Sequence, residues 1–227
     1  MNIIMTGSTS FVGAATVREL LRRGHTVTAI VRPKSSKLDT ILEGNEEALL
    51  SGRLLVTEND LSEPEKLLEK VTKPQDVFCH FGWGGSGSAS RTDKALQEKN
   101  MEISLETIRT AKALGCKKFL FSGSQAEYGM HQELITENTV CEPKSLYGEA
   151  KLAMREKGEK LCDELGLRYI HARIFSAYGP GDHPWTLVES CLDTFLSNKE
   201  MSLGACTQKW NFLYICLLYT SDAADEL

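Results

Sequence analysis

The first 175 residues alternate short apolar runs with longer amphipathic stretches, and this alternation constrains the fold more than any other feature. Parallel strands need a long crossover between them, usually a helix, so the pattern is typical of a parallel α/β sheet. The apolar runs predict strands at Asn2–Met5, Thr26–Val31, Arg53–Val56, Asp76–Phe81, Lys117–Phe121 and Arg168–Ile174. Leucine and isoleucine spacing predicts helices over Phe11–Arg23 and Glu102–Leu114, which end before Gly24 and Gly115. The expected fold is α/β, with a doubly wound parallel sheet.

Composition and charge exclude several classes of partner. A net charge of -5 gives no basic footprint for a nucleic-acid backbone. No apolar run is long enough to cross a bilayer, and the first residues do not have the charged start of a signal peptide. The seven cysteines lack metal-ligand or disulfide spacing and suit free thiols in a reducing compartment. We therefore expect a cytoplasmic protein with no nucleic-acid partner, no membrane and no metal.

A glycine-containing turn joins the first predicted strand to the first helix. Gly7 suits a tight turn and Gly13 a close helix–strand contact, while a helix N-terminus attracts a pyrophosphate. Ser10 stands where the pattern T-G-x-x-G-x-x-G has its middle glycine. A serine there can donate a hydrogen bond to phosphate, although its side chain narrows the approach. Together with Phe11 and Val12, these residues predict a dinucleotide site of the Rossmann type.

The ends of the second and third predicted strands bear on which dinucleotide is bound. Arg32 follows the second strand, where an arginine can hold the extra phosphate of NADP, and Lys34 and Lys37 could assist it. A solvated loop arginine is the alternative. Asp60 and Leu61 could contact the adenine, but an ordinary helix cap is also open for Asp60. NADP is therefore the preferred cofactor, with NAD as the alternative.

Three polar residues could form a centre for proton exchange. Tyr147 and Lys151 are four residues apart at the start of a predicted helix and so share a face. A cationic lysine one turn away favours the phenolate and moves the tyrosine pKa towards neutral pH. Such spacing is also common on solvated helices. It gains weight from Ser124, which follows an apolar strand and could hydrogen-bond the reacting oxygen.

The order of these motifs resembles the extended short-chain dehydrogenase/reductase family of nucleotide-sugar epimerases, dehydratases and reductases. The resemblance covers residues 1–215. Its motifs are T-G-x-x-S-F-V-G, F-x-F-S-G-S-x-x-x-Y-G, Y-G-x-x-K and R-I-F-S-A-Y-G-P-G, with Asn100 in a helix between the first two. The resemblance implies that Ser124, Tyr147 and Lys151 are the catalytic triad. Tyr147 would exchange the substrate proton, Lys151 would also hold the nicotinamide ribose, and Asn100 would lie near the site.

The resemblance also implies further contacts and partners. Phe81 and Gly82 would line the cofactor, and a nucleotide-sugar substrate would meet Trp83, Ser124, Gln125, Arg173 and Ser176. Many members have an asparagine where Ser176 stands and a proline where Ile174 stands, so the substrate contacts differ here. His183, Trp185 and Trp210 could line the substrate lobe, although such residues more often fill a core. A homodimer would form through the helices that carry Asn100 and Tyr147.

The residues beside Ser124 limit the chemistry. The family's 4,6-dehydratases carry an Asp-Glu pair where Gln125 and Ala126 stand, and its enzymes that epimerise carbons flanking the ketone have a cysteine at Ala126. Neither Gln125 nor Ala126 transfers a proton. Glu127, one residue further along an extended segment, would point in a different direction from Ala126, and a structural carboxylate is the alternative role for it. Reduction or 4-epimerisation of a nucleotide sugar remains, and Arg32 favours reduction. A catalytically silent NADP-binding sensor or scaffold is the alternative, against which the intact triad argues.

We expect three segments along the 227 residues. Residues 1–175 would form the NAD(P)-binding domain, and residues 176–215 part of a smaller, truncated C-terminal substrate lobe. Residues 216–227 resemble the in-frame translation of a sequencing adapter, with a genuine C-terminal helix as the alternative. The chain is accordingly expected to be a fragment that binds cofactor better than substrate.

Overall fold

The sheet of the first unit has the strand order β3-β2-β1-β4-β5-β6, and all of its neighbouring strands are parallel. This computed structural model describes residues 1–85, 87, 89–207 and 209–218. The chain divides into two units, Met1–Ile174 and Phe175–Leu227. The strand order of this sheet reverses at β1, because β2 and β3 lie on one side of β1 and β4 to β6 lie on the other. The predicted doubly wound α/β sheet is confirmed.

The strands lie where the apolar runs predicted them. Their bounds are β1 Asn2–Thr6, β2 Thr26–Val31, β3 Leu54–Glu58, β4 Val77–His80, β5 Lys118–Ser124 and β6 Arg168–Ile174. β5 runs on to Ser124, past its predicted end at Phe121, because its last residues continue to pair with β6 as far as Ile174. Hydroxyl residues and glycine at these positions indicate a loop when the sequence is considered alone.

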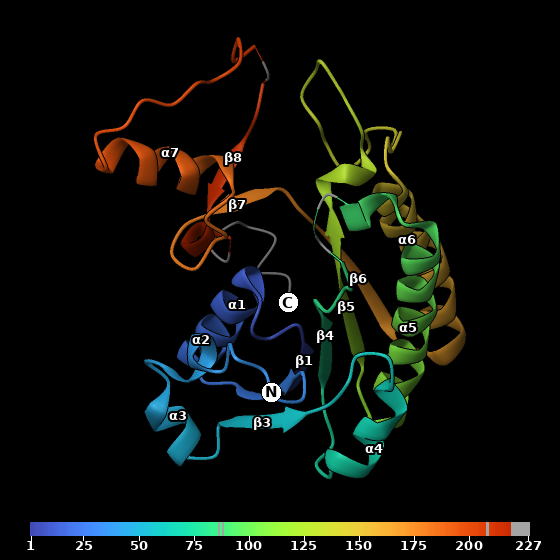
Figure 1. Ribbon diagram of the computed structural model, residues 1–227. Coiled ribbons are helices and arrows are strands. Elements are labelled where there is room, and N and C mark those ends of the chain that lie inside the picture. The colour runs from blue at the N-terminus through green and yellow to red at the C-terminus, as the bar shows by residue number, and fades with distance from the viewer. Residues whose placement is uncertain (86, 88, 208, 219–227) are drawn as a thin grey trace. The chain divides into compact units, whose positions relative to one another are not determined.

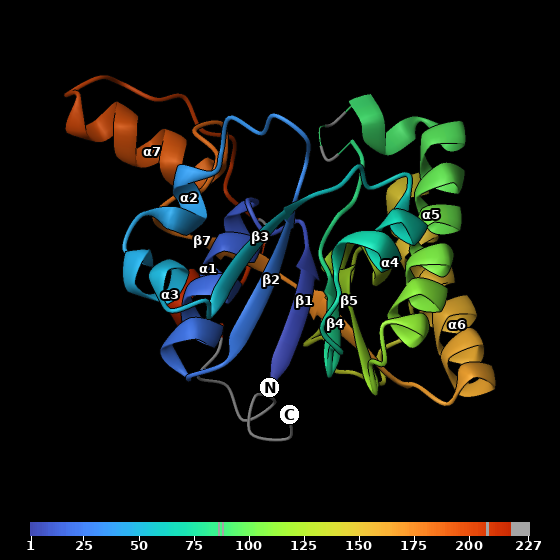
Figure 2. The same cartoon turned by 90° about the horizontal axis from the view of Figure 1, so that it is seen from below.

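Helices cover both faces of the sheet (Figures 1 and 2). On one face lie α1 Phe11–Arg22, α2 Asp39–Leu42 and α3 Glu46–Leu50. On the other lie α4 Leu67–Lys70, α5 Lys94–Ala113 and α6 Leu146–Leu165. Single turns of 3-10 helix occur at Pro64–Lys66 (η1), Ala89–Thr92 (η2) and Gln125–Glu127 (η3). α5 begins before its predicted start at Glu102 because the Asp93 side chain caps it by accepting from Leu96 N.

Side chains that alternate between the two faces of the sheet form two separate hydrophobic cores. In β1, Ile3 and Met5 pack with α1 on one face, while Ile4 joins the cluster under α5 and α6. Phe78 of β4 lies in the second cluster and stacks on Phe119 of β5, with their ring centroids 5.5 Å apart. Because successive side chains of a strand point to opposite faces, a run of consecutive apolar residues fills both layers.

The described residues of the second unit form two parallel strands, β7 Ser176–Tyr178 and β8 Phe212–Tyr214, with α7 Leu187–Leu196 and a 3-10 turn, η4 Ile215–Leu217. The interpretation of Trp185 and Trp210 as core residues is wrong, since they are 73% and 57% exposed. Trp185 stacks on His183 at a centroid distance of 4.3 Å, and Trp210 donates from Nε1 to Ser176 Oγ. Most of the adapter-like segment, residues 219–227, lies outside the described residues.

The described residues contain no helix that is long and apolar enough to cross a membrane. Within the same ranges, no three His, Cys, Asp or Glu side chains gather as metal ligands would.

Two neighbouring leucines of α4 test the layered core. Leu67 is 1% exposed and belongs to the cluster under α5, whereas Leu68 is 46% exposed. We expect Leu67→Ala to lower the free energy of unfolding by about 2–5 kcal/mol, through lost burial and a residual cavity. Leu68→Ala is the matched control and should cost roughly 0.5 kcal/mol or less. Urea unfolding measures both, and equal losses would contradict the assignment of the core.

Candidate active site

The turn between β1 and α1 lies at the carboxyl edge of the sheet, where the strand order reverses. Gly7 has a φ of +69°, and a Cβ there would lie 2.7 Å from the carbonyl carbon of Phe81. A Cβ on Gly13 would clash with Gly7 O. The backbone of the turn therefore lies closer to the Phe81–Gly82 peptide than any side chain at Gly7 would permit. The N-terminus of α1 points to the same edge of the sheet. Such a cradle fits a pyrophosphate.

Ser10 has a different role from the expected phosphate donor. Its hydroxyl donates to Gly7 O at 2.7 Å and accepts from Gly13 N at 3.1 Å. The one hydroxyl proton is thus used inside the turn, and the side chain caps α1. Phe11 and Val12 form the first turn of the helix, and both are half-buried.

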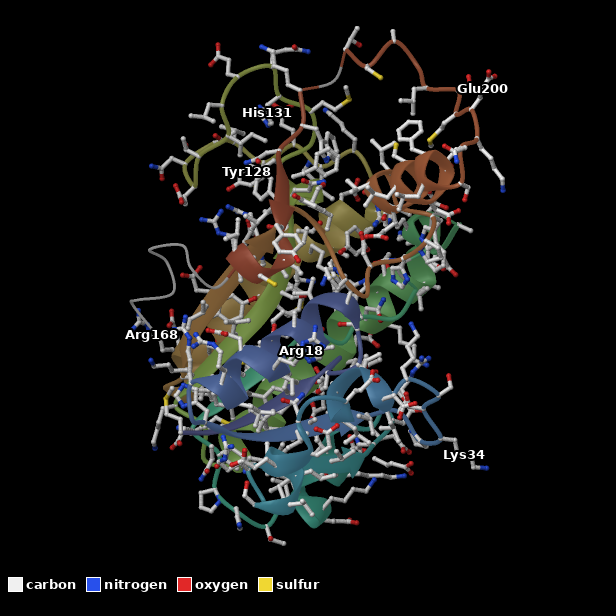
Figure 3. All side chains as sticks on the ribbon, turned by 90° about the vertical axis from the view of Figure 1, so that its left-hand side faces the viewer. Arg18, Lys34, Tyr128, His131, Arg168 and Glu200 are labelled. Carbon is white, nitrogen blue, oxygen red and sulfur yellow. The ribbon has the colours of Figure 1, made fainter. Side chains whose placement is uncertain are left out.

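The ends of β2 and β3 present polar groups to solvent. Arg32 is exposed directly after β2, and Lys34 projects away from the body of the first unit (Figure 3). Asp60 accepts from the backbone N–H and the hydroxyl of Ser62, which lower the pKa of the carboxyl, as do Lys99 and Arg32 more weakly. Asp60 therefore closes a local turn with Ser62 and is not a helix cap, since Glu63 is the N-cap of η1, and its contact with adenine stays a prediction. Leu61 packs on Gly82, where a Cβ would lie 2.7 Å from the leucine Cδ1.

The loop after β4 is held by α5. Asn100 accepts from Gly84 N at 2.9 Å and donates to Gly84 O at 2.8 Å, so its amide occupies both backbone groups of one residue. Trp83 donates from Nε1 to Gln97 Oε1 at 3.0 Å. This part of the loop is thus fixed by hydrogen bonds, while residues 86 and 88 lie outside the described ranges.

Ser124, Tyr147 and Lys151 lie together at the end of β5. The Ser145 side chain caps α6 by accepting from Gly148 N, which places Tyr147 in the first turn of this helix. The Tyr147 phenol is hydrogen-bonded to the Ser124 side chain. The Lys151 Nζ donates to Ser122 O at 2.8 Å and lies 4.0 Å from the centre of the Trp83 ring. The three residues predicted from spacing therefore share one site.

Burial governs the charges of this site. Burial lowers the pKa of Lys151 to about 7, although the Glu127 carboxylate acts in the opposite direction. Burial also raises the pKa of Tyr147, and it outweighs the hydrogen bond to Ser124 and the charge of Arg91, which lower it. The expected lowering of the Tyr147 pKa by a cationic lysine is therefore not the net result, because burial of the phenol outweighs the groups that lower its pKa.

Glu127 anchors a polar cluster behind Ser124. Its carboxylate is 0% exposed, accepts from Ser124 N at 2.7 Å and from Arg173 Nε at 2.8 Å, and lies 3.0 Å from His171 Nε2. This is the structural role that the sequence left as the alternative. Sequence reasoning missed His171 and Tyr169. The signal was present, because polar residues at 169, 171 and 173 alternate along β6 and so share one face.

The residues expected to contact substrate lie in both units. Arg173 donates from Nη1 to the Tyr128 hydroxyl at 2.7 Å, and this bond, like the one from its Nε to Glu127, stays within the first unit. Tyr128 in turn accepts at its carbonyl from His131, which lies beside it (Figure 3). Gln125 is half-buried in the first unit, whereas Ser176 belongs to the second. Their contacts with a substrate stay a prediction.

The buried lysine makes stability depend on pH. Its folded pKa of about 7 lies below the reference value of 10.5, so between these values the unfolded chain binds a proton that the folded chain does not. Stability should therefore rise with pH above about 7, by up to roughly 1.4 kcal/mol per pH unit relative to Lys151→Met, which lacks the group. Urea unfolding of both proteins between about pH 7.5 and 9 measures this. Parallel pH profiles would show that Lys151 is not desolvated.

Residues 3–216 match the sequence model of a protein family described as "NAD dependent epimerase/dehydratase family". An uncharacterised UDP-glucose epimerase of Bacillus subtilis, YtcB, is 27% identical over 95% of this chain and 69% of its own length. The NAD(+)-dependent dTDP-6-deoxy-L-talose 4-dehydrogenase of Aggregatibacter actinomycetemcomitans is 30% identical over 75% of this chain and 60% of its own.

Solved structures show the same fold. The UDP-N-acetylglucosamine 4-epimerase from Methanobrevibacter ruminantium M1, in complex with UDP-N-acetylmuramic acid, has a TM-score of 0.82 and 24% identity, over 96% of this chain and 70% of that one. The alignments thus span about 60% to 70% of the length of these three relatives.

Proposed function

Because the chain belongs to the NAD dependent epimerase/dehydratase family, we propose that it is an NAD(P)-dependent oxidoreductase that reduces or 4-epimerises a nucleotide sugar. Ser124, Tyr147 and Lys151 are its reacting centre. One observation carries the proposal: the phenol of Tyr147 is hydrogen-bonded to Ser124 beside a buried lysine, at the carboxyl edge that also holds the Gly7 turn. Residues 1–175 are the cofactor-binding domain, and residues 176–215 part of a substrate lobe.

The cofactor accepts or returns a hydride when it is bound. The Gly7–Gly13 turn and the N-terminus of α1 hold its pyrophosphate, and Arg32 holds the extra phosphate of NADP, the preferred form. Further residues at the same edge contact other parts of the cofactor. Asp60 and Leu61 contact the adenine, and Phe81 and Gly82 line the cofactor. Asn100, Tyr147 and Lys151 lie at the nicotinamide ribose. Support comes from the missing side chain at Gly7 and from the exposure of Arg32 at the end of β2.

Tyr147 exchanges the proton of the substrate hydroxyl, and Ser124 orients the reacting oxygen. A raised pKa keeps the phenol protonated at neutral pH, and a protonated phenol is the form that reduction of a ketone consumes. The preference for reduction rests on Arg32, through its proposed contact with the extra phosphate of NADP. Neither Gln125 nor Ala126, which follow Ser124, supplies the additional acid or base that loss of water requires, so a 4,6-dehydratase is disfavoured.

A nucleotide sugar is the proposed substrate, which matches the names of the relatives above. Trp83, Gln125, Arg173 and Ser176 are its proposed contacts. We also infer a homodimer through α5 and α6. The exposed residues of these helices are mostly charged, for example Glu98, Arg109, Arg155 and Glu159, so such an interface would be polar rather than apolar.

Removing one hydroxyl tests the centre. Tyr147→Phe should lower turnover by a factor on the order of 100 to 10,000, because it removes the hydroxyl that donates the proton, while the affinity for NADPH should change far less. NADPH oxidation with a panel of nucleotide keto-sugars measures this in the full-length gene product. Tyr169→Phe also removes a part-buried phenol hydroxyl, and it should lower turnover far less, because that hydroxyl is bonded to Met154 O and His171 Nδ1 rather than to Ser124. A parent protein that binds NADPH without any turnover would favour the sensor alternative.

Arg32 tests the choice of cofactor. Arg32→Asp should weaken NADPH binding by a factor of roughly 10 to 100, since it replaces an ion pair with phosphate by repulsion, and should spare NADH. Lys117→Asp is the matched control, because it makes the same change of charge before β5, at the amino edge of the sheet. Fluorescence titration gives both dissociation constants. An unchanged ratio of NADPH to NADH affinity would remove the argument for NADP.

A further inference from the structure

His80, the last residue of β4, is a buried titratable residue that the proposed function does not use. It is 1% exposed, and its ring centroid lies 5.9 Å from those of both Phe119 and Phe121. Nδ1 lies 2.9 Å from Thr6 Oγ1, at the end of β1, and Nε2 lies 3.1 Å from Ser104 Oγ in α5. One imidazole ring therefore joins three elements through hydrogen bonds.

The hydroxyl protons decide the tautomer of this ring. The Ser104 hydroxyl donates its single proton to Asn100 O at 2.8 Å, so it can only accept from His80. Nε2 of His80 then carries the hydrogen and Nδ1 is an acceptor, to which Thr6 donates. The Thr6 oxygen keeps a lone pair that accepts from Gly82 N at 3.3 Å. Burial, aided by the charge of Lys151, lowers the pKa of His80 to about 3, so the ring stays neutral.

Both ends of this chain of hydrogen bonds reach the same loop. Thr6 binds Gly82 at one end, and the side chain of Asn100 binds both backbone groups of Gly84 at the other. The loop is closely packed, because a Cβ on Gly82 would meet Leu61 at 2.7 Å and one on Gly84 would meet Asn100 Oδ1 at 2.9 Å. Gly7 rests directly on the Phe81–Gly82 peptide. The position of this peptide therefore sets the position of the turn.

We propose that His80, as the neutral Nε2–H tautomer, is a positioning residue that holds the Gly82–Gly84 loop, and with it the Gly7 turn, in the geometry that binds NAD(P). The inference rests on the proposed function, since it takes the Gly7 turn as the pyrophosphate site. The ring acts through Thr6 on one side and through Ser104 on the other, and it touches no reacting atom. Breaking either hydrogen bond weakens binding of the cofactor rather than the transfer of the proton.

Thr6 offers a test with an internal rescue. Thr6→Val keeps the shape of the side chain but leaves Nδ1 of His80 and the N–H of Gly82 without their partner, and should raise the Kd for NADPH by roughly tenfold. Thr6→Ser keeps the hydroxyl and should bind about as well as the parent. Fluorescence titration measures Kd, and urea unfolding shows that each variant is folded. A purely structural role would lower stability in Thr6→Val without changing its Kd, which would overturn the inference.

Ser104 tests the other side with a matched control. Ser104→Ala removes the acceptor of the Nε2 hydrogen and should also raise Kd. Thr107→Val removes a second buried α5 hydroxyl, which donates to Ile103 O and is not among the described hydrogen-bond partners of His80, and should leave Kd unchanged. In the parent, ¹⁵N NMR should show His80 protonated at Nε2 alone at neutral pH, and an Nδ1–H tautomer or an imidazolium would overturn the inference. A parent chain that is folded but binds neither NADPH nor NADH would instead overturn the proposed function.

Discussion

The contact on which this architecture depends is made by backbone alone. Gly7 lies so close to the Phe81–Gly82 peptide that a single added carbon would overlap it, and a carbon added to Gly13 would overlap Gly7 O. These contacts draw together the carboxyl end of β1, the loop after β4 and the start of α1. The strand order reverses at this point, so the connections after β1 and β4 run to opposite faces of the sheet and leave an edge where a ligand can approach the backbone.

Desolvation is the second physical theme of the site. The same dry layer under α5 and α6 lowers the pKa of Lys151 and of His80 and raises that of Tyr147. Buried charge is tolerated where it is paired, as in Glu127, which two basic side chains and a backbone N–H surround. The neutral His80 and the ionised Glu127 illustrate the two ways in which a folded chain keeps a titratable group out of water.

Much of the fold was predictable because it follows from local periodicity. The strand positions and the helix endings at Gly24 and Gly115 were visible in the order of apolar residues, and both glycines adopt the positive φ expected after a helix. The spacing of Tyr147 and Lys151 placed them on one face, and the structure brings Ser124 to the same place. Local pattern did not reveal that β5 continues through Ser122–Ser124, because that extension depends on pairing with β6, far away in the sequence.

The sequence by itself determined the alternation of strands and helices, the glycines that permit close backbone contact, and the polar residues grouped around Ser124. These depend on residue type and near neighbours, which periodicity records. Only the tertiary structure decided how those groups are charged and what they bind. The hydroxyl of Ser10 turns inward to cap α1, Arg173 pairs with Glu127, and Lys151 lies under Trp83 where water does not reach. Burial and long-range pairing set these outcomes, and neither can be read from spacing along the chain.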